Sequence, residues 1–237
     1  MAGVTGVRVG IGSGLGGNLF LAVVSGMFLT NLALVFLYVP TERVMGIVQR
    51  IFYFHVPLAL VGFLSFFIVF IASVLYLVKR SEKWDRRAQA AAEVGIVFLT
   101  GAIITGAIWA KPVWGTWWTW DPKLTTTFIL WVIYIGYLMI RNLAPTRSQA
   151  ARYSAVIGII GAVDIPIVYM ASEWWRTLHP NLVAGPLSET GSLESSMRFV
   201  FYFSIVTFTL LLFYLIKART AQRRAEEAVE ELRWAFE

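Results

Sequence analysis

The chain has 237 residues, of which 58% are hydrophobic and only 14% are charged, and its formal net charge is +6. A soluble core cannot hold so much apolar sequence, so the composition excludes an ordinary soluble domain and indicates an integral membrane protein. The absence of cysteine excludes disulfides, thiolate metal sites and cysteine nucleophiles. The positive charge is typical of cytoplasmic loops that face anionic lipid, and no basic stripe interleaved with aromatic residues points to nucleic acid.

Apolar runs follow one another along the chain, each close to the roughly 20 residues that cross a bilayer. We expect an all-α integral membrane protein whose membrane domain covers residues 18–216. The glycine-rich residues 1–17 are expected to be a flexible N-terminal tail. Residues 217–237, where arginines precede glutamates at helical spacing, are expected to be a charged cytoplasmic C-terminal helix. The six predicted transmembrane helices cover residues 18–39, 57–78, 91–110, 124–140, 153–170 and 197–216.

Lys and Arg are unevenly divided between the two sets of connections. They are more numerous on the side that holds both termini, so the positive-inside rule predicts that both termini are cytoplasmic. The external side then receives residues 41–55, the stretch between the third and fourth helices, and residues 171–196. In the first of these connections, apolar side chains recur at helical spacing, and we expect an amphipathic helix that lies flat on the membrane.

The external connection between the third and fourth helices is rich in tryptophan. This Trp-rich stretch, residues 111–127, reads KPVWGTWWTWDPKLTTT and contains Trp114, Trp117, Trp118 and Trp120. Aromatic rings with a polar group favour the membrane interface, so an aromatic belt is one interpretation. So many rings close together also favour a second interpretation, in which they form an aromatic platform for a flat ligand. Asp121 followed by proline is typical of a helix start, with Asp as the N-cap.

The chain has only two histidines, His55 and His179, and both are predicted to lie on the external side, close to the tryptophans. One interpretation is that they are interfacial polar groups. The other is that they are metal ligands, because imidazole binds iron, zinc and copper well. Two imidazoles from different segments can coordinate opposite faces of a haem iron. Tryptophans would cover the porphyrin, and Arg or Lys would pair with its propionates. Arg50 and Arg176 are the predicted partners, from a wider set that also contains Lys111, Lys123 and Arg198.

Two other functions are considered. Asp164 lies inside the fifth predicted span, where a carboxylate is costly and is normally paired or functional. A permease subunit of an ABC-type or secondary transporter is therefore an alternative, and a structural scaffold with an aromatic belt is another. No carboxylate pair, Ser/His/Asp set or P-loop is evident. We accordingly expect a protein that is not an enzyme and does not itself hydrolyse ATP.

The segment WGTWWTWD, residues 114–121, resembles the tryptophan-rich WWD motif of haem-handling membrane proteins in cytochrome c maturation. Together with the six predicted spans and the segment DIPIVYMASEWWRTLHP, residues 164–180, it is similar to the CcmC branch, the haem exporter proteins C. The resemblance covers roughly Val39 to Lys217. Pro122 and Lys123 depart mildly from the small residue and Arg expected there, which weakens a propionate role for Lys123.

The resemblance implies a multi-pass protein of the bacterial inner membrane that binds b-type haem non-covalently at the external face. His55 and His179 would be the axial ligands. It implies presentation of haem to the haem chaperone CcmE, together with CcmD, and association with the ABC transporter subunits CcmA and CcmB. The residues that would form the haem platform are Trp114, Trp117, Trp118, Trp120 and Asp121.

Overall fold

The computed structural model describes residues 15–179 and 193–236. Helices dominate these residues, which contain no strand, and six helical segments are long and apolar enough to cross a membrane. The prediction of an all-α, six-span membrane protein is therefore confirmed. The elements are α1 (Leu15–Ala33), the π-helical turn η1 (Leu34–Tyr38), the 3₁₀ helix η2 (Ile47–Ile51), α2 (Phe52–Lys79), α3 (Glu82–Trp114), α4 (Pro122–Leu143), α5 (Arg147–Trp174) and α6 (Ser195–Phe236).

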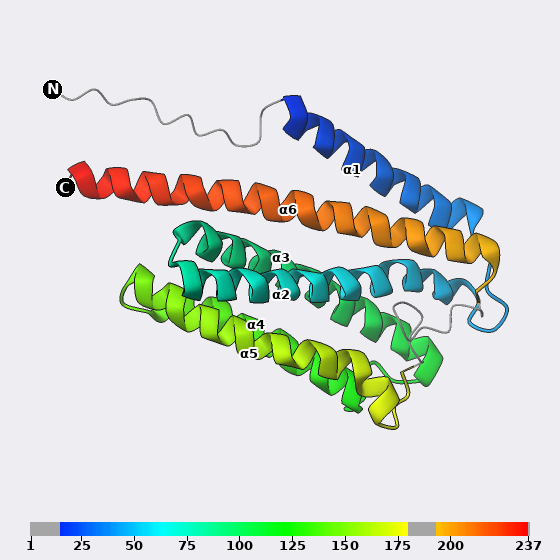
Figure 1. Ribbon diagram of the computed structural model, residues 1–237. Coiled ribbons are helices and arrows are strands. Elements are labelled where there is room, and N and C mark those ends of the chain that lie inside the picture. The colour runs from blue at the N-terminus through cyan, green and yellow to red at the C-terminus, as the bar shows by residue number, and fades with distance from the viewer. Residues whose placement is uncertain (1–14, 180–192, 237) are drawn as a thin grey trace.

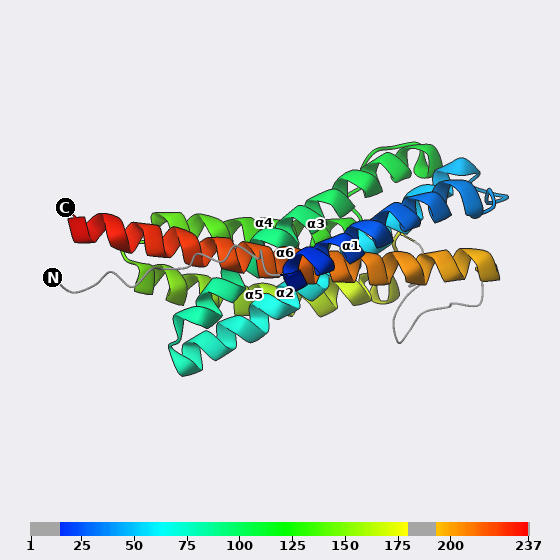
Figure 2. The same ribbon diagram turned by 90° about the horizontal axis from the view of Figure 1, so that it is seen from above.

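Helix α2 lies in the middle of the bundle and packs against α3, α5 and α6 (Figures 1 and 2). Helices α4 and α5 pair with each other on one side, and α1 packs mainly against α6 on the other. At the centre, the ring of Phe66 on α2 stacks on that of Tyr134 on α4, with centroids 3.7 Å apart. The Tyr134 hydroxyl donates to the Gly158 carbonyl of α5 at 3.2 Å. These contacts join three helices and satisfy a polar group in an apolar core.

Helix α1 is fastened to α6 by a buried polar contact. Asn31 and Ser204 are both fully buried, and the Ser204 hydroxyl donates to the Asn31 side-chain oxygen at 2.7 Å. Hydrogen bonds between transmembrane helices contribute on the order of 1 kcal/mol each. The contact therefore fixes the register of α1, which otherwise buries few of its side chains.

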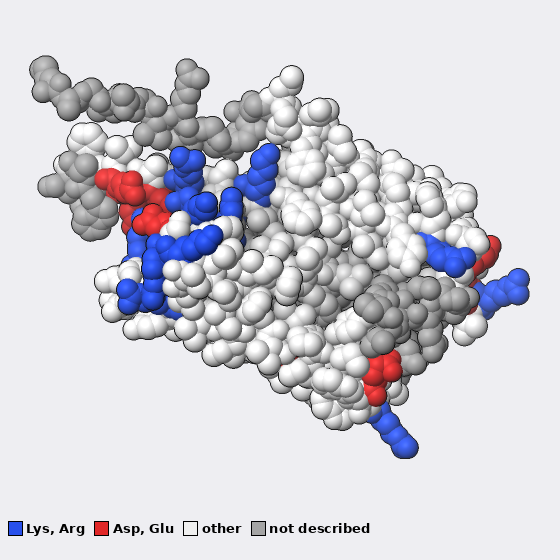
Figure 3. Space-filling model, in the orientation of Figure 1, with Lys and Arg blue, Asp and Glu red and all other residues white. Residues whose placement is uncertain are grey.

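The opposite end of the bundle from the Trp-rich stretch carries most of the visible Lys and Arg side chains (Figure 3). Helix α6 has 42 residues, which at 1.5 Å per residue is roughly 60 Å, about twice the hydrocarbon thickness. Its polar C-terminal part continues without a break and is joined to α3 by ion pairs. Glu93 contacts both Arg219 and Arg223, and Arg86 binds Glu227 at 2.6 Å. The cytoplasmic location of this end stays a prediction.

The amphipathic helix expected over residues 41–55 is found only in part, because residues 47–51 form η2 and residues 52–55 already belong to α2, whereas the preceding residues are not helical. The Glu42 carboxylate accepts the Val44 backbone N–H at 2.8 Å, which forms a tight turn instead. Gly46 follows with φ of 64°, a left-handed conformation that interrupts a helix. The 3₁₀ helix η2 then leads directly into α2, so residue 55 lies within the first turns of a transmembrane helix.

Candidate functional site

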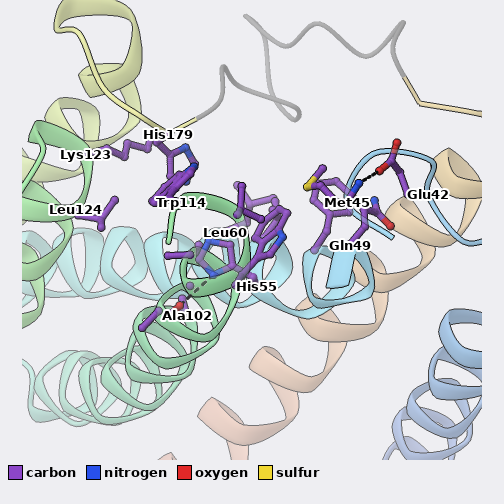
Figure 4. Close-up of a pocket in the computed structure, with 18 of the residues that line it drawn as sticks. Glu42, Met45, Gln49, His55, Leu60, Ala102, Trp114, Lys123, Leu124 and His179 are labelled. Atoms are coloured by element: carbon purple, nitrogen blue, oxygen red, sulfur yellow. Dashed lines mark hydrogen bonds between the residues drawn. The ribbon is translucent and has the colours of Figure 1, made fainter. Parts of the chain in front are cut away.

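A cavity of about 690 Å³ opens between α2, α3 and the start of α4, at the end that carries the Trp-rich stretch. This volume lies within the usual range for small-molecule sites, roughly 300–1,000 Å³. Figure 4 shows His179 and Lys123 at one end of the cavity, Glu42, Met45 and Gln49 at the other, and His55 between them. Most of the remaining wall residues are apolar, and the majority of these come from α2 and α3.

His55 is held on α2 in a defined orientation. Its Nδ1 atom lies 3.0 Å from the carbonyl oxygen of Ala102 on α3. A carbonyl oxygen can only accept, so Nδ1 carries the hydrogen and donates it, and Nε2 keeps its lone pair. A carbonyl that fixes the tautomer of an imidazole is the arrangement commonly found behind metal-ligating histidines. His55 is therefore prepared to coordinate through Nε2.

His179 reaches the cavity from a different part of the chain. Helix α5 ends at Trp174, and the following segment brings His179 to the cavity wall beside Trp114. The two rings meet edge to face, with centroids 6.4 Å apart. The two histidines, distant in sequence, thus line the same cavity, although each lies on its own segment.

The Trp-rich stretch is divided by the structure into inward and outward tryptophans. Trp114 and Trp118 line the cavity, whereas Trp117 is 56% and Trp120 is 72% exposed. Helix α3 ends at Trp114, and the next residue, Gly115, is its C-cap, with a φ of 78°, a left-handed conformation that favours glycine. Trp109 of α3 also lines the cavity and lies edge-on to His55 at 5.7 Å. It was not among the predicted site residues, although it lies just before the stretch.

Asp121 does not line the cavity but organises the residues around it. Its Oδ1 atom accepts the Leu124 backbone N–H at 3.0 Å, and Pro122 is the first residue of α4. The predicted N-cap is therefore confirmed. Its second oxygen, Oδ2, accepts the hydroxyl of Thr177 at 2.8 Å, a contact that the sequence does not reveal.

The two arginines predicted for the site lie away from the cavity. Arg50 donates weakly to the Val39 carbonyl at 3.5 Å and lies over the Phe36 ring, and Arg176 is exposed. Lys123, by contrast, lines the cavity near His179 and is only 8% exposed. Its ammonium group donates to the Tyr169 carbonyl at 3.1 Å. An ammonium has three N–H donors, so this contact leaves others for an anionic group.

The side chains around the cavity fit a flat, largely apolar ligand with a metal at its centre. Two imidazoles face one space bounded by indole rings. Among residues 15–179 and 193–236, no three His, Asp or Glu side chains gather to hold a bare metal ion. A pair of imidazoles suits a metal whose other positions are already filled, as in a haem.

Comparison with known proteins agrees with this chemistry. Residues 15–234 match the profile of the family described as Heme exporter protein C, CcmC. The chain belongs to this family. It is 34% identical over 172 residues to the Heme exporter protein C of Bradyrhizobium diazoefficiens, an alignment that covers 73% of this chain and 65% of the relative. Less than two thirds of that relative is thus matched.

Two further relatives carry the same name. The Heme exporter protein C of Escherichia coli K12 is 33% identical over 174 residues, covering 73% of this chain and 69% of the relative. That of Paracoccus denitrificans is 33% identical over 188 residues, covering 78% of both chains. The resemblance noted in the WWD motif therefore extends over most of this member of the CcmC family.

Proposed function

We propose that the protein binds haem in the cavity beside the Trp-rich stretch and presents it for cytochrome c maturation at the external face of the bacterial inner membrane. The relatives named Heme exporter protein C support haem as the cargo. The observation that carries the proposal is that His55 and His179 line one cavity, with Nε2 of His55 free to coordinate. In this proposal the protein is a carrier subunit and not an enzyme.

The chain's own residues divide the binding between them. His55 and His179 would hold the iron from two segments, and Trp114 and Trp118 would cover the ring. Ligation by two imidazoles leaves no open position on the iron, which suits carriage better than oxygen chemistry. The haem would be b-type and held without a covalent bond.

Lys123 is the best-placed cation for a propionate. It lies at the His179 end of the cavity, whereas Glu42 and Glu194 lie among the wall residues with Arg43. The propionate edge of the haem would be attracted to the buried ammonium of Lys123, and the carboxylates of Glu42 and Glu194 would repel it. Arg50 and Arg176 could then contribute only if their segments moved towards the cavity.

The transfer of haem to a partner requires that one ligand can be released. His55 is fixed on a transmembrane helix by Ala102, whereas His179 lies beyond the end of α5. His179 is therefore the ligand more suited to release. The expected receiver is the haem chaperone CcmE, with CcmD and the ABC transporter subunits CcmA and CcmB as the other members of the complex.

The test is to purify the protein and measure bound haem by absorption spectroscopy. We expect His55→Ala and His179→Ala each to lower haem content, and added imidazole to restore part of it. Rescue by imidazole would separate loss of a ligand from loss of the fold. Unchanged haem content in both variants would contradict the assignment of the two ligands.

A further inference from the structure

We propose that Thr177 is a positioning residue that fixes His179 against the start of α4. The inference rests on the proposed function, because it concerns a ligand of the same site. It assigns a role to a side chain that neither the WWD motif nor the cavity lining points to. It also explains why one carboxylate, Asp121, lies beside a cavity that it does not line.

The contacts form a continuous chain between the two segments. Asp121 caps α4 through Oδ1, with the Leu124 N–H 3.0 Å away. Its Oδ2 accepts the hydroxyl hydrogen of Thr177 at 2.8 Å. The Thr177 oxygen in turn accepts the backbone N–H of His179 at 3.1 Å. The carboxylate that ends the Trp-rich loop thus also holds the segment that carries the second histidine.

Each of these hydrogen bonds favours a fixed geometry of the two segments that it joins. A carboxylate at a helix N-terminus is stabilised by the helix dipole and by the free N–H groups there. A hydrogen bond to an ionised carboxylate is roughly twice as strong as one between neutral groups. Thr177 uses its hydroxyl both as donor and as acceptor, so Ser can replace it here and Val cannot.

The need for such a contact follows from where α5 ends. The helix stops at Trp174, and its last backbone hydrogen bond runs from the Trp175 N–H to the Ala171 carbonyl, so residues 176–179 lie beyond the helix. Fixing such a segment costs roughly 1–2 kcal/mol of conformational entropy per residue. By binding both Asp121 and the His179 backbone, Thr177 limits the positions open to the imidazole beside Trp114. Thr177 would thereby set how readily His179 leaves the iron.

The experiment compares Thr177→Val, Thr177→Ser and Thr125→Val in the full-length protein. Thr125 lies one residue past Leu124 in the first turn of α4, and its buried hydroxyl has no hydrogen-bond partner among residues 15–179 and 193–236. Its Val variant is therefore the matched control. In the haem-loaded, oxidised protein, the optical and EPR spectra report the fraction of iron with two imidazoles. We expect Thr177→Val to lower the ratio of ligated to unligated His179 by roughly 10-fold. Thr177→Ser and Thr125→Val should match the wild type.

A second measurement does not need haem. In the haem-free protein, amide hydrogen exchange of residues 177–179 should be roughly 10-fold faster in Thr177→Val and unchanged in Thr177→Ser. Unchanged exchange and unchanged spectra in the Val variant would overturn the inference, as would a Ser variant that behaves like Val. If the Val variant does not fold, Asp121→Asn serves instead. Asn still caps α4 but offers no charge to Thr177, so exchange at His179 should rise, and no rise would overturn the inference.

The outcomes also separate the two proposals. A wild-type protein that binds no haem would contradict the proposed function, while the exchange measurement would still decide the role of Thr177. A wild-type protein that loses haem on His179→Ala, with Thr177→Val unchanged in both measurements, would contradict only the role of Thr177.

Discussion

Gly106 on α3 leaves the space that the imidazole of His55 occupies, because a Cβ atom on Gly106 would lie 2.8 Å from Cε1 of His55. Such a contact is too short, so Gly106→Ala must push the ring or tilt α2 away from α3. Either movement breaks the bond between Nδ1 and the Ala102 carbonyl, which orients the free Nε2. We expect haem affinity to fall by at least about 10-fold, measured by titrating haem into the purified protein.

Gly101→Ala is the matched control for this variant. Gly101 lies on the same helix, but the nearest atoms to its added Cβ would be the two methyl groups of Leu58, at 3.4 and 3.5 Å, which can shift slightly. It should therefore bind haem like the wild type. Equal loss of haem affinity in both variants would show that α3 does not tolerate a methyl group at either glycine. It would then contradict a specific role for Gly106.

The second prediction concerns the difference between the tryptophans that line the cavity and those that are exposed. Trp114 lines the cavity and touches the His179 ring, whereas Trp117 is largely exposed. Trp114→Ala removes a wall of the site and should weaken haem binding by about 10-fold or more. Trp117→Ala should weaken it far less in the isolated protein. The two titrations are directly comparable, and a larger loss for Trp117 would mean that the loop rearranges when haem binds.

Features of the fold and of the site that depend on neighbouring residues in sequence could be predicted from the sequence. The apolar runs predicted every membrane span, because length and hydropathy are sufficient for that. The helices nevertheless extend beyond the runs, since polar turns at their ends continue the helix: α3 begins at Glu82 and α6 continues to Phe236. The pair Asp121-Pro122 predicted a helix start correctly, because capping is a local property.

The contacts that the sequence could not predict join distant segments or lie in irregular backbone. Nothing in the spacing of the tryptophans indicates that Trp118 faces inward and Trp120 outward, because residues 115–121 have no regular period. The choice of Arg50 and Arg176 over Lys123 followed the general preference of Arg for carboxylates. That preference says nothing of where a side chain points. The contact between Asp121 and Thr177 spans 56 positions in sequence and needs three-dimensional information.

A third prediction concerns stability at the end opposite the cavity. Arg141 binds Asp85 through two hydrogen bonds of 2.6 and 2.7 Å, and its side chain is only 10% exposed. Arg141→Met would leave the Asp85 carboxylate without its partner in a partly buried position, at a cost of about 3 kcal/mol. Thermal unfolding in detergent should show a lower midpoint. The double variant Arg141→Met with Asp85→Leu should recover part of the loss, because it removes both charges.

The last prediction concerns the C-terminal part of α6. Glu93 on α3 contacts both Arg219 and Arg223, and its side chain is only 18% exposed. Without it, the acidic partner left to the two arginines among the described residues is Glu226, which lies on α6 itself and cannot hold that helix to α3. Glu227 still pairs with Arg86 of α3. We therefore expect Glu93→Gln to loosen α6 around residues 219–224 while the membrane-spanning part stays folded.

Limited digestion with trypsin measures this loosening, since trypsin cleaves after Lys and Arg and needs locally unfolded chain. Cleavage after residues 219–224 should become roughly 10-fold faster in Glu93→Gln, which corresponds to about 1.4 kcal/mol of local stability. Glu231→Gln is the matched control, because Glu231 is exposed near the end of the same helix. It should leave the rate unchanged. An equal rate in the wild type and in Glu93→Gln would show that other contacts, such as apolar packing and the Arg86–Glu227 ion pair, hold α6 to α3 without Glu93.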